Sequence, residues 1–216
     1  VNAIAISGHK IGAPVGIGAL VYRSGGEACF MLHSLISGGP QEQRLRGGTE
    51  NLLGAVGFGA AAEVLSKTLS IELRSRFRSR ERLWKILRES VPAIVRLGPI
   101  VDADLDYDPV SLSNTLLVQI PGCRGDDLVA ALDINGVAAS TGSACSSGRQ
   151  EISPSVRALG LDSESAREVL RLSLDWDTSD EEVAKAADIV SATVEQMRTF
   201  AVDAAASQEL SKESAA

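Results

Sequence analysis

The sequence predicts a mixed α/β fold in two parts that are joined by a long helix. Residues 2–6 and 16–22 are short apolar stretches with β-branched or small side chains, and both predict strands. Residues 50–89 predict a helix, and strand and helix patterns alternate from about residue 91. The chain has 216 residues, of which 44% are hydrophobic and 23% charged, so it can form one large domain or two unequal ones.

Two glycine-rich loops separate the elements of the first part. The stretch "SGHKIGAPVG" lies between the two strands, and "ISGGPQEQRLRGGT" (residues 36–49) carries two arginines before the helix. In that helix the apolar positions keep mostly to one face and arginines crowd the other. We expect a first domain over residues 1–66 and a second over 67–204 that includes the linking helix. The apolar positions are Leu69, Leu73, Phe77, Trp84 and Leu87.

The second part alternates strands and helices. Residues 93–97, 114–120, 136–140 and 169–174 predict strands, and residues 125–135 predict a helix that ends at Gly136. Pro154 begins another helix that stops near Gly160. Ser179 and Glu182 form a capping box before a last helix, and residues 205–216 predict a disordered tail. The core positions of the last helix are Val183, Ala186, Ala187, Val190, Val194 and Met197.

Composition narrows the classes of function. The net charge of −7 argues against general nucleic-acid binding, and no apolar run is expected to reach the length of a membrane span. Three scattered cysteines make a poor disulfide framework and favour a reducing, cytoplasmic setting. The chain opens at Val1, inside a predicted strand and without a signal peptide, so we interpret it as a fragment.

Lys10 is the first candidate for chemistry. A lysine in such a loop is usually a solvated surface residue. Its neighbours favour a functional interpretation, because Ser7 and His9 offer polar groups and the loop glycines let the backbone approach a ligand. A lysine in this position can form a Schiff base with an aldehyde cofactor, of which pyridoxal phosphate (PLP) is the common case.

Two arginine-bearing segments offer anion sites. "RLRGGTEN" is either a surface turn or a site where arginines, backbone N–H groups and the Thr49 hydroxyl bind a phosphate. Arg171 lies inside the apolar strand "EVLRLSL" and needs a partner there. That partner is either a carboxylate of the chain, Asp175 or Asp177, or the carboxylate of an amino-acid substrate.

Cys145 lies in "ASTGSACSSG", a stretch of small side chains without charge. An accessible thiol on such a loop is a candidate nucleophile, whereas Cys29 and Cys123 lack a comparable loop. His9 and His33 are too far apart in the sequence to suggest a metal site, so none is predicted.

Taken in order, four segments resemble the PLP-dependent cysteine desulfurases of the class V aminotransferase family. They are "SGHKIGAPVGIGAL", "RLRGGTEN", "STGSACSSG" and "VLRLSLDWDTSDEEV", and the resemblance covers almost the whole chain. It implies PLP fold type I, aminotransferase-like, with the end of the large domain followed by a small α+β C-terminal domain. The cysteine segment resembles the subgroup with a long, flexible loop.

The resemblance also assigns expected roles around the cofactor. Lys10 would hold PLP covalently, and Ser7 and His9 would contact its phosphate. Thr49 would reach the phosphate of the cofactor in the neighbouring subunit of a homodimer.

The implied reaction uses two more residues. Arg171 would bind the carboxylate of L-cysteine, and Cys145 would attack its sulfur, which gives a persulfide on Cys145 and L-alanine. The persulfide sulfur would pass to an acceptor or scaffold protein for iron–sulfur clusters or other sulfur cofactors. A mobile loop suits a thiol that must serve two sites.

The chain departs from the family pattern in three ways. Val15 stands where the family often has lysine, and Asp175 stands where it usually has glycine and could compete for Arg171. The long stretch that precedes the lysine in the family, with the aspartate that pairs with the pyridine nitrogen, is not in this sequence. A selenocysteine lyase, an aminotransferase of the same fold and a non-catalytic fragment with exposed apolar sheet edges therefore stay open as alternatives.

Overall fold

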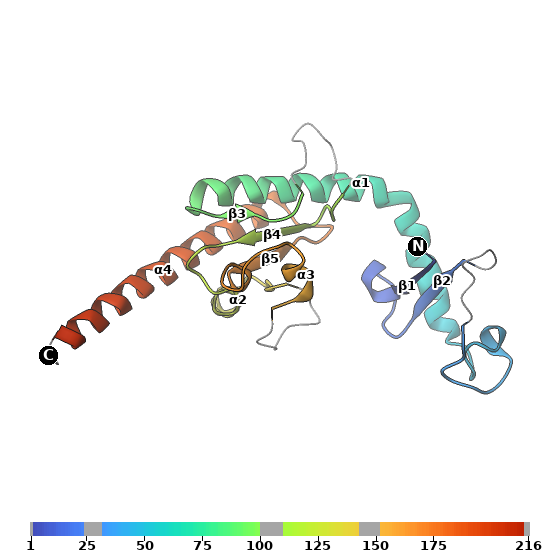
Figure 1. The fold of residues 1–216 in the computed structure, drawn as a ribbon. Coiled ribbons are helices and arrows are strands. Elements are labelled where there is room, and N and C mark those ends of the chain that lie inside the picture. The colour runs from blue at the N-terminus through green and yellow to red at the C-terminus, as the bar shows by residue number, and fades with distance from the viewer. Residues whose placement is uncertain (1, 24–31, 100–109, 143–151, 214–216) are drawn as a thin grey trace. The chain divides into compact units, whose positions relative to one another are not determined.

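The structure is a computed structural model that describes residues 2–23, 32–99, 110–142 and 152–213, with side chains up to residue 203 in the last helix. It divides into two compact units, Val1–Ser70 and Ile71–Ala216. Both contain strands and helices, which confirms the predicted mixed α/β composition (Figure 1).

The first unit is built on a two-stranded antiparallel sheet. Strands β1 (Ala3–Ser7) and β2 (Gly18–Tyr22) pair in register from Ala3 opposite Tyr22 to Ser7 opposite Gly18. The 3₁₀ helices η1 (Gly8–Ile11) and η2 (Gln41–Arg44) lie in the two glycine-rich loops. Ile4, Leu20 and Val21 of this sheet are each half exposed or more.

Helix α1 (Leu52–Ser90) is the predicted linking helix. Its first turn is capped by Asn51, whose side-chain oxygen accepts a hydrogen bond from the Gly54 N–H at 3.0 Å. Phe77 and Leu87 are buried as predicted, but Leu69 is 42% exposed. The predicted apolar face is therefore buried mainly in the half of the helix that belongs to the second unit.

The second unit contains a three-stranded antiparallel sheet in the order β3–β4–β5 (Figure 1). Its strands are β3 (Val95–Arg96), β4 (Thr115–Gln119) and β5 (Val169–Ser173), with Leu117 of β4 opposite Arg171 of β5. Because side chains alternate along a strand, Leu170 and Leu172 join the main core, whereas Arg171 and Val169 lie on the opposite face.

Helices α2 (Gly125–Ile134) and α4 (Asp180–Glu213) complete the main core together with the second half of α1. Figure 1 shows α1 and α4 running along the sheet. The short helices α3 (Pro154–Arg157) and η4 (Ser165–Arg167) supply Val156 and Ala166 to a smaller cluster with Val169. The predicted capping box of α4 is confirmed, since Glu182 accepts hydrogen bonds from the Ser179 N–H at 2.7 Å and from its hydroxyl at 2.8 Å.

Three predicted elements differ in the structure. Residues 136–140 form no strand, and only Ser140 makes an isolated bridge, to Arg171, because the chain leaves the sheet edge on either side of that pair. Helix α3 ends at Arg157, three residues before Gly160. The last helix continues to Glu213 and so includes residues 205–213, for which the sequence predicts a tail.

The expectation about membrane spans is also wrong in one respect. By length and composition alone, α1 is apolar enough to cross a membrane. A stretch of 18 residues in this helix has a mean hydropathy of 1.3, and only 6% of that stretch is buried. One such helix is weak support for a membrane protein. The same stretch leaves Leu52, Leu53 and Val56 exposed, so this half of α1 is an exposed apolar surface.

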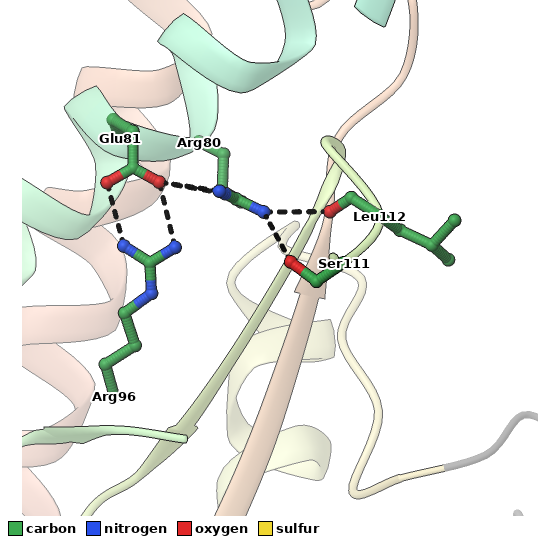
Figure 2. A network of polar contacts seen from close by, with 5 residues as sticks. All are labelled: Arg80, Glu81, Arg96, Ser111 and Leu112. Atoms are coloured by element: carbon green, nitrogen blue, oxygen red, sulfur yellow. Dashed lines mark hydrogen bonds and ion pairs between the residues drawn. The ribbon is translucent and has the colours of Figure 1, made fainter. Parts of the chain in front are cut away.

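A polar network fixes α1 against the sheet of the second unit (Figure 2). Arg80 is fully buried and donates hydrogen bonds to Glu81 at 3.0 Å and to the Leu112 carbonyl at 2.9 Å. Arg96 of β3 donates two hydrogen bonds to the same Glu81 carboxylate, at 2.8 and 2.9 Å. Glu81 thus neutralises two arginines and joins the helix to β3.

Replacing Glu81 by glutamine is expected to lower the free energy of unfolding by roughly 1–3 kcal/mol, because buried Arg80 would lose its counter-charge. Burial alone would raise the pKa of Glu81. The hydrogen bonds and positive charges of Arg96, and to a smaller extent those of Arg80, outweigh the effect of burial, so the pKa of Glu81 is lowered. A carboxylate with a lowered folded-state pKa stabilises the protein above its unfolded pKa and loses this effect as the pH falls through the folded value.

Urea unfolding of wild type and Glu81→Gln at neutral and acidic pH checks this prediction. The difference between the two proteins should shrink steadily below the ordinary glutamate pKa of 4.5. Glu63→Gln on the same helix is the control, because its ion pair with Lys67 is exposed and should contribute little. A difference that is constant with pH would show that the charge of Glu81 is not the source of the stability.

Candidate active site

The Ser7–Lys10 turn begins where β1 ends. Ser7 is the last residue of the strand, and Gly8 enters η1 with its N–H donating to the Ile17 carbonyl at 2.9 Å. A Cβ at Gly8 would lie 2.8 Å from that carbonyl oxygen, so only glycine fits there. Gly12 closes the turn with φ of 84°. This backbone exposes the side chains of Ser7, His9 and Lys10 within one tight turn.

Residues 36–49 form a folded loop that is closed by backbone contacts. Ile36 and Arg46 make a parallel bridge, and the Gly47 N–H donates to the Ile36 carbonyl at 2.7 Å. Gly47 lies directly against Gly38, since a Cβ on Gly47 would be 2.8 Å from the Gly38 nitrogen. The Arg46 guanidinium donates to the Thr49 carbonyl at 3.2 Å. These contacts fix the backbone that carries Thr49.

The tip of the same loop is strained. Glu42, Gln43 and Arg44 are three consecutive non-glycine residues in the left-handed region, with φ of 48°, 56° and 67°. This conformation costs about 1 kcal/mol or more for each residue. Strain of this kind persists where the surrounding contacts impose it, and it is frequent at ligand sites. The strained tip favours the anion-site interpretation of this loop over a surface turn, and that interpretation stays a prediction.

Arg171 lies in the middle of β5, and its backbone pairs with Ser140 on the free side of the strand. The Arg171 N–H donates to the Ser140 carbonyl at 2.6 Å, and the Ser140 N–H donates to the Arg171 carbonyl at 3.1 Å. Among the described residues, the Nε atom of Arg171 is buried and has no hydrogen-bond partner. An arginine N–H that is buried without a partner favours an acceptor supplied by a ligand.

Asp175, which stands where the family usually has glycine, does not pair with Arg171 in the described structure. The Asp175 carboxylate accepts the Trp176 N–H at 2.7 Å, and the Asp175 N–H donates to the Thr178 hydroxyl at 2.9 Å. Within the described ranges no ion pair joins Arg171 to Asp175 or Asp177. Both internal partners that the sequence offered for Arg171 are therefore unused.

The described residues just before Cys145 include one that pairs with the Arg171 strand. Cys145 and Cys29 lie outside the described residues. Gly142, three residues before Cys145, packs against Ser153, since a Cβ on Gly142 would lie 3.0 Å from the Ser153 Cβ. Two residues earlier Ser140 is bonded to Arg171. The sequence showed no sign of this arrangement beyond the strand it predicted over 136–140.

Cys123 is a structural cysteine, as expected. It is 1% exposed, and burial raises the pKa of its thiol, while the nearby charge of Arg198 lowers it by less. A buried thiol with a raised pKa is a poor nucleophile.

The candidate residues fall into two groups. Ser7, His9, Lys10 and Thr49 belong to the first unit, and Arg171 belongs to the second. The structure brings Ser7, His9 and Lys10 together on one turn. No hydrogen bond in the described part of the chain joins them to Thr49, and none is required if Thr49 serves a neighbouring subunit.

The residues present fit a phosphate-bearing aldehyde cofactor. Lys10 is exposed, and in the described ranges its amine has no hydrogen-bond or ion-pair partner, so it is available for a covalent bond. Ser7 and His9 offer hydrogen-bond donors on the same turn, which suit a phosphate.

Each unit thus offers groups suited to an anionic small molecule, on a mixed α/β framework. The profile of the family described as aminotransferase class-V matches residues 1–185. The chain therefore belongs to the class V aminotransferase family, and its fold is a portion of the aminotransferase-like PLP fold type I.

Individual relatives agree with this assignment. The chain is 35% identical over 205 residues to an IscS-like cysteine desulfurase of Mycobacterium tuberculosis, covering 94% of this chain and 49% of that protein. It is 33% identical over 201 residues to a cysteine desulfurase of Trichormus azollae, covering 93% and 47%. The structure of a NifS-like protein from Rickettsia africae matches with a TM-score of 0.72 at 25% identity, covering 90% and 48%. The chain spans about half the length of the curated relatives it matches.

Proposed function

We propose that this chain carries the lysine, cysteine and substrate-arginine elements of a PLP-dependent cysteine desulfurase. The reaction converts L-cysteine to L-alanine and leaves the sulfur as a persulfide on Cys145. The observation that carries the proposal is the backbone pairing of Arg171 with Ser140. It sets an arginine, whose buried Nε has no hydrogen-bond partner among the described residues, beside the start of the segment that contains the candidate nucleophile.

The first unit supplies the cofactor side of the site. PLP, when bound, acts as an electron sink that labilises bonds at the substrate's Cα and Cβ atoms. Lys10 offers the amine that holds it covalently, and Ser7 and His9 donate hydrogen bonds to its phosphate. Thr49, on the loop clamped by Arg46, offers its hydroxyl to the phosphate of a neighbouring subunit's cofactor.

The second unit supplies the substrate side. Arg171 binds the carboxylate of L-cysteine with paired N–H donors and so fixes the position of its side chain. The Cys145 sulfur forms a bond to the substrate sulfur as the bond between that sulfur and the substrate Cβ breaks. The Cβ takes up a proton, so one cysteine and one thiol give one alanine and one persulfide.

The persulfide then passes its outer sulfur to an acceptor or scaffold protein that builds iron–sulfur clusters or other sulfur cofactors. The partners of the reaction are L-cysteine and that acceptor, and the functional form is a homodimer in the cytoplasm. Relatives named cysteine desulfurase support L-cysteine as the substrate.

Alanine production tests the proposed reaction against its alternatives. Protein supplied with PLP and L-cysteine should form L-alanine, and Cys145→Ala should lower the rate at least about 100-fold, because the variant lacks the proposed nucleophile and the one thiol within the described ranges, Cys123, is buried. Cys123→Ala is the matched control and should retain the rate, since Cys123 is buried. Transamination that survives Cys145→Ala would identify an aminotransferase instead. Formation of neither product would indicate a non-catalytic chain.

A further inference from the structure

The positive charge of this acidic chain is concentrated in one part of α1. Residues 74–88 contain seven of the 21 lysines and arginines and one of the 28 acidic residues. The segment therefore carries a formal charge of +6 in a chain whose net charge is −7. A solvated helix face usually mixes both signs, so this separation needs a reason.

Four of these cations form one exposed row, which we name the basic stripe: Arg74, Arg78, Lys85 and Arg88. Their spacing of four, seven and three residues places them within one narrow face of a helix with 3.6 residues per turn. At 1.5 Å per residue the stripe is about 21 Å long. The ordered helix holds the cations in line before any partner binds.

The rest of the same segment is committed to the fold. Leu83 and Leu87 are buried and anchor the opposite side of α1, so the helix cannot turn the stripe inward. Other cations nearby are neutralised, Arg76 by Glu72 at 3.2 Å and Arg82 by Asp180. Within the described ranges, Arg78, Lys85 and Arg88 have no such carboxylate partner.

We propose that the basic stripe is a docking surface for an acidic face of a partner protein. The partner would present three or four carboxylates along about 21 Å, the length of the stripe. Three of the four stripe residues are arginines, whose planar guanidinium groups bind carboxylates through paired hydrogen bonds and are enriched in protein interfaces. The role is separate from the candidate active site and goes beyond the proposed reaction.

Two other polyanions fit the stripe less well. Single-stranded nucleic acid binds through aromatic side chains as well as cations, and the stripe contains no aromatic residue. The two aromatic residues beside it in the sequence are not available, because Phe77 is buried and Trp84 is packed against the core. The acidic remainder of the chain would repel a broad anionic membrane surface, whereas carboxylates confined to the length of the stripe meet only the stripe.

Binding of fluorescent poly-L-glutamate, followed by fluorescence anisotropy at about 50 mM and about 300 mM salt, tests the proposal. Reversing three charges in Arg78→Glu/Lys85→Glu/Arg88→Glu should weaken binding about tenfold or more and reduce its salt dependence. The matched control Arg124→Glu/Arg157→Glu/Arg167→Glu changes the net charge equally at exposed sites in the same unit and should change affinity less than about twofold. If the charge reversal disturbs folding, the neutral variant Arg78→Gln/Lys85→Gln/Arg88→Gln takes its place. This variant should weaken binding to an intermediate degree.

Oligo-dT of matched charge and phosphatidylserine vesicles are measured in parallel. Preferential binding of poly-L-glutamate that depends on the stripe supports the proposal. If the stripe and control variants lose equal amounts of affinity for poly-L-glutamate, the proposal is overturned, because binding would then depend on the net charge of the chain alone. Tighter binding of oligo-dT or vesicles than of poly-L-glutamate would overturn the assignment to an acidic protein.

Discussion

Replacing Lys10 by alanine is expected to abolish covalent PLP binding, measured as the visible absorption band that a lysine-bound cofactor gives. Lys10 is exposed on the turn that follows β1, beside Ser7 and His9, and its amine is uncommitted in the described structure. Without an amine at that position no group on the turn can bond to the cofactor aldehyde, so the loss should be complete. Titration of wild type and variant with PLP measures it.

Lys67→Ala is the matched control for this experiment. Lys67 is an equally exposed lysine of the first unit, and its amine is paired with Glu63 at 2.7 Å on α1. The band should persist in this variant. An unchanged band in Lys10→Ala would show that another lysine holds PLP and would remove the central residue of the proposed site.

Replacing Arg171 by leucine is expected to raise KM for L-cysteine roughly 30-fold or more, because losing the partner of a hydrogen-bonded charge pair costs about 2–5 kcal/mol. The apolar substitute suits the strand, so the fold should persist. The PLP absorption band should stay unchanged, because Arg171 is proposed to contact substrate and not cofactor. Steady-state alanine formation over a range of cysteine concentrations measures the change.

Arg167→Leu serves as the control, because Arg167 is exposed on η4 two residues before β5 and has no proposed contact with substrate. A similar KM in Arg171→Leu and wild type would contradict the proposed substrate site. A fall in kcat with KM unchanged would show that the Arg171 side chain does not act by binding the substrate in its ground state.

Local sequence signals predicted most of the fold. The strands around Ala5, Val118 and Leu170 and the capping box at Ser179 were predictable because each depends on side chains within a few residues. Residues 136–140 were assigned to a strand because they are apolar, whereas sheet pairing is decided by distant residues, and only Ser140 meets Arg171. The tail was assigned to disorder from its polar composition, although α4 extends through it to Glu213.

The candidate site was predicted through residue types and not through geometry. The sequence analysis pointed to the glycines of the Lys10 loop as a group. The close approaches at Gly8 and between Gly38 and Gly47 depend on contacts that no local pattern contains. The same is true of the buried Arg171 Nε and of the Arg46 clamp on Thr49. Such contacts join residues that are separated in sequence, so they emerge only when the chain is folded.

The measurement that tests the proposed function most directly is the location of the transferred sulfur. Protein is treated with PLP and L-cysteine, its thiols are alkylated without reduction, and its peptides are analysed by mass spectrometry. The account predicts one additional sulfur atom on the peptide that contains Cys145 and none on the buried Cys123. Alanine formation with no added sulfur on Cys145, or with the sulfur on Cys29, would contradict it.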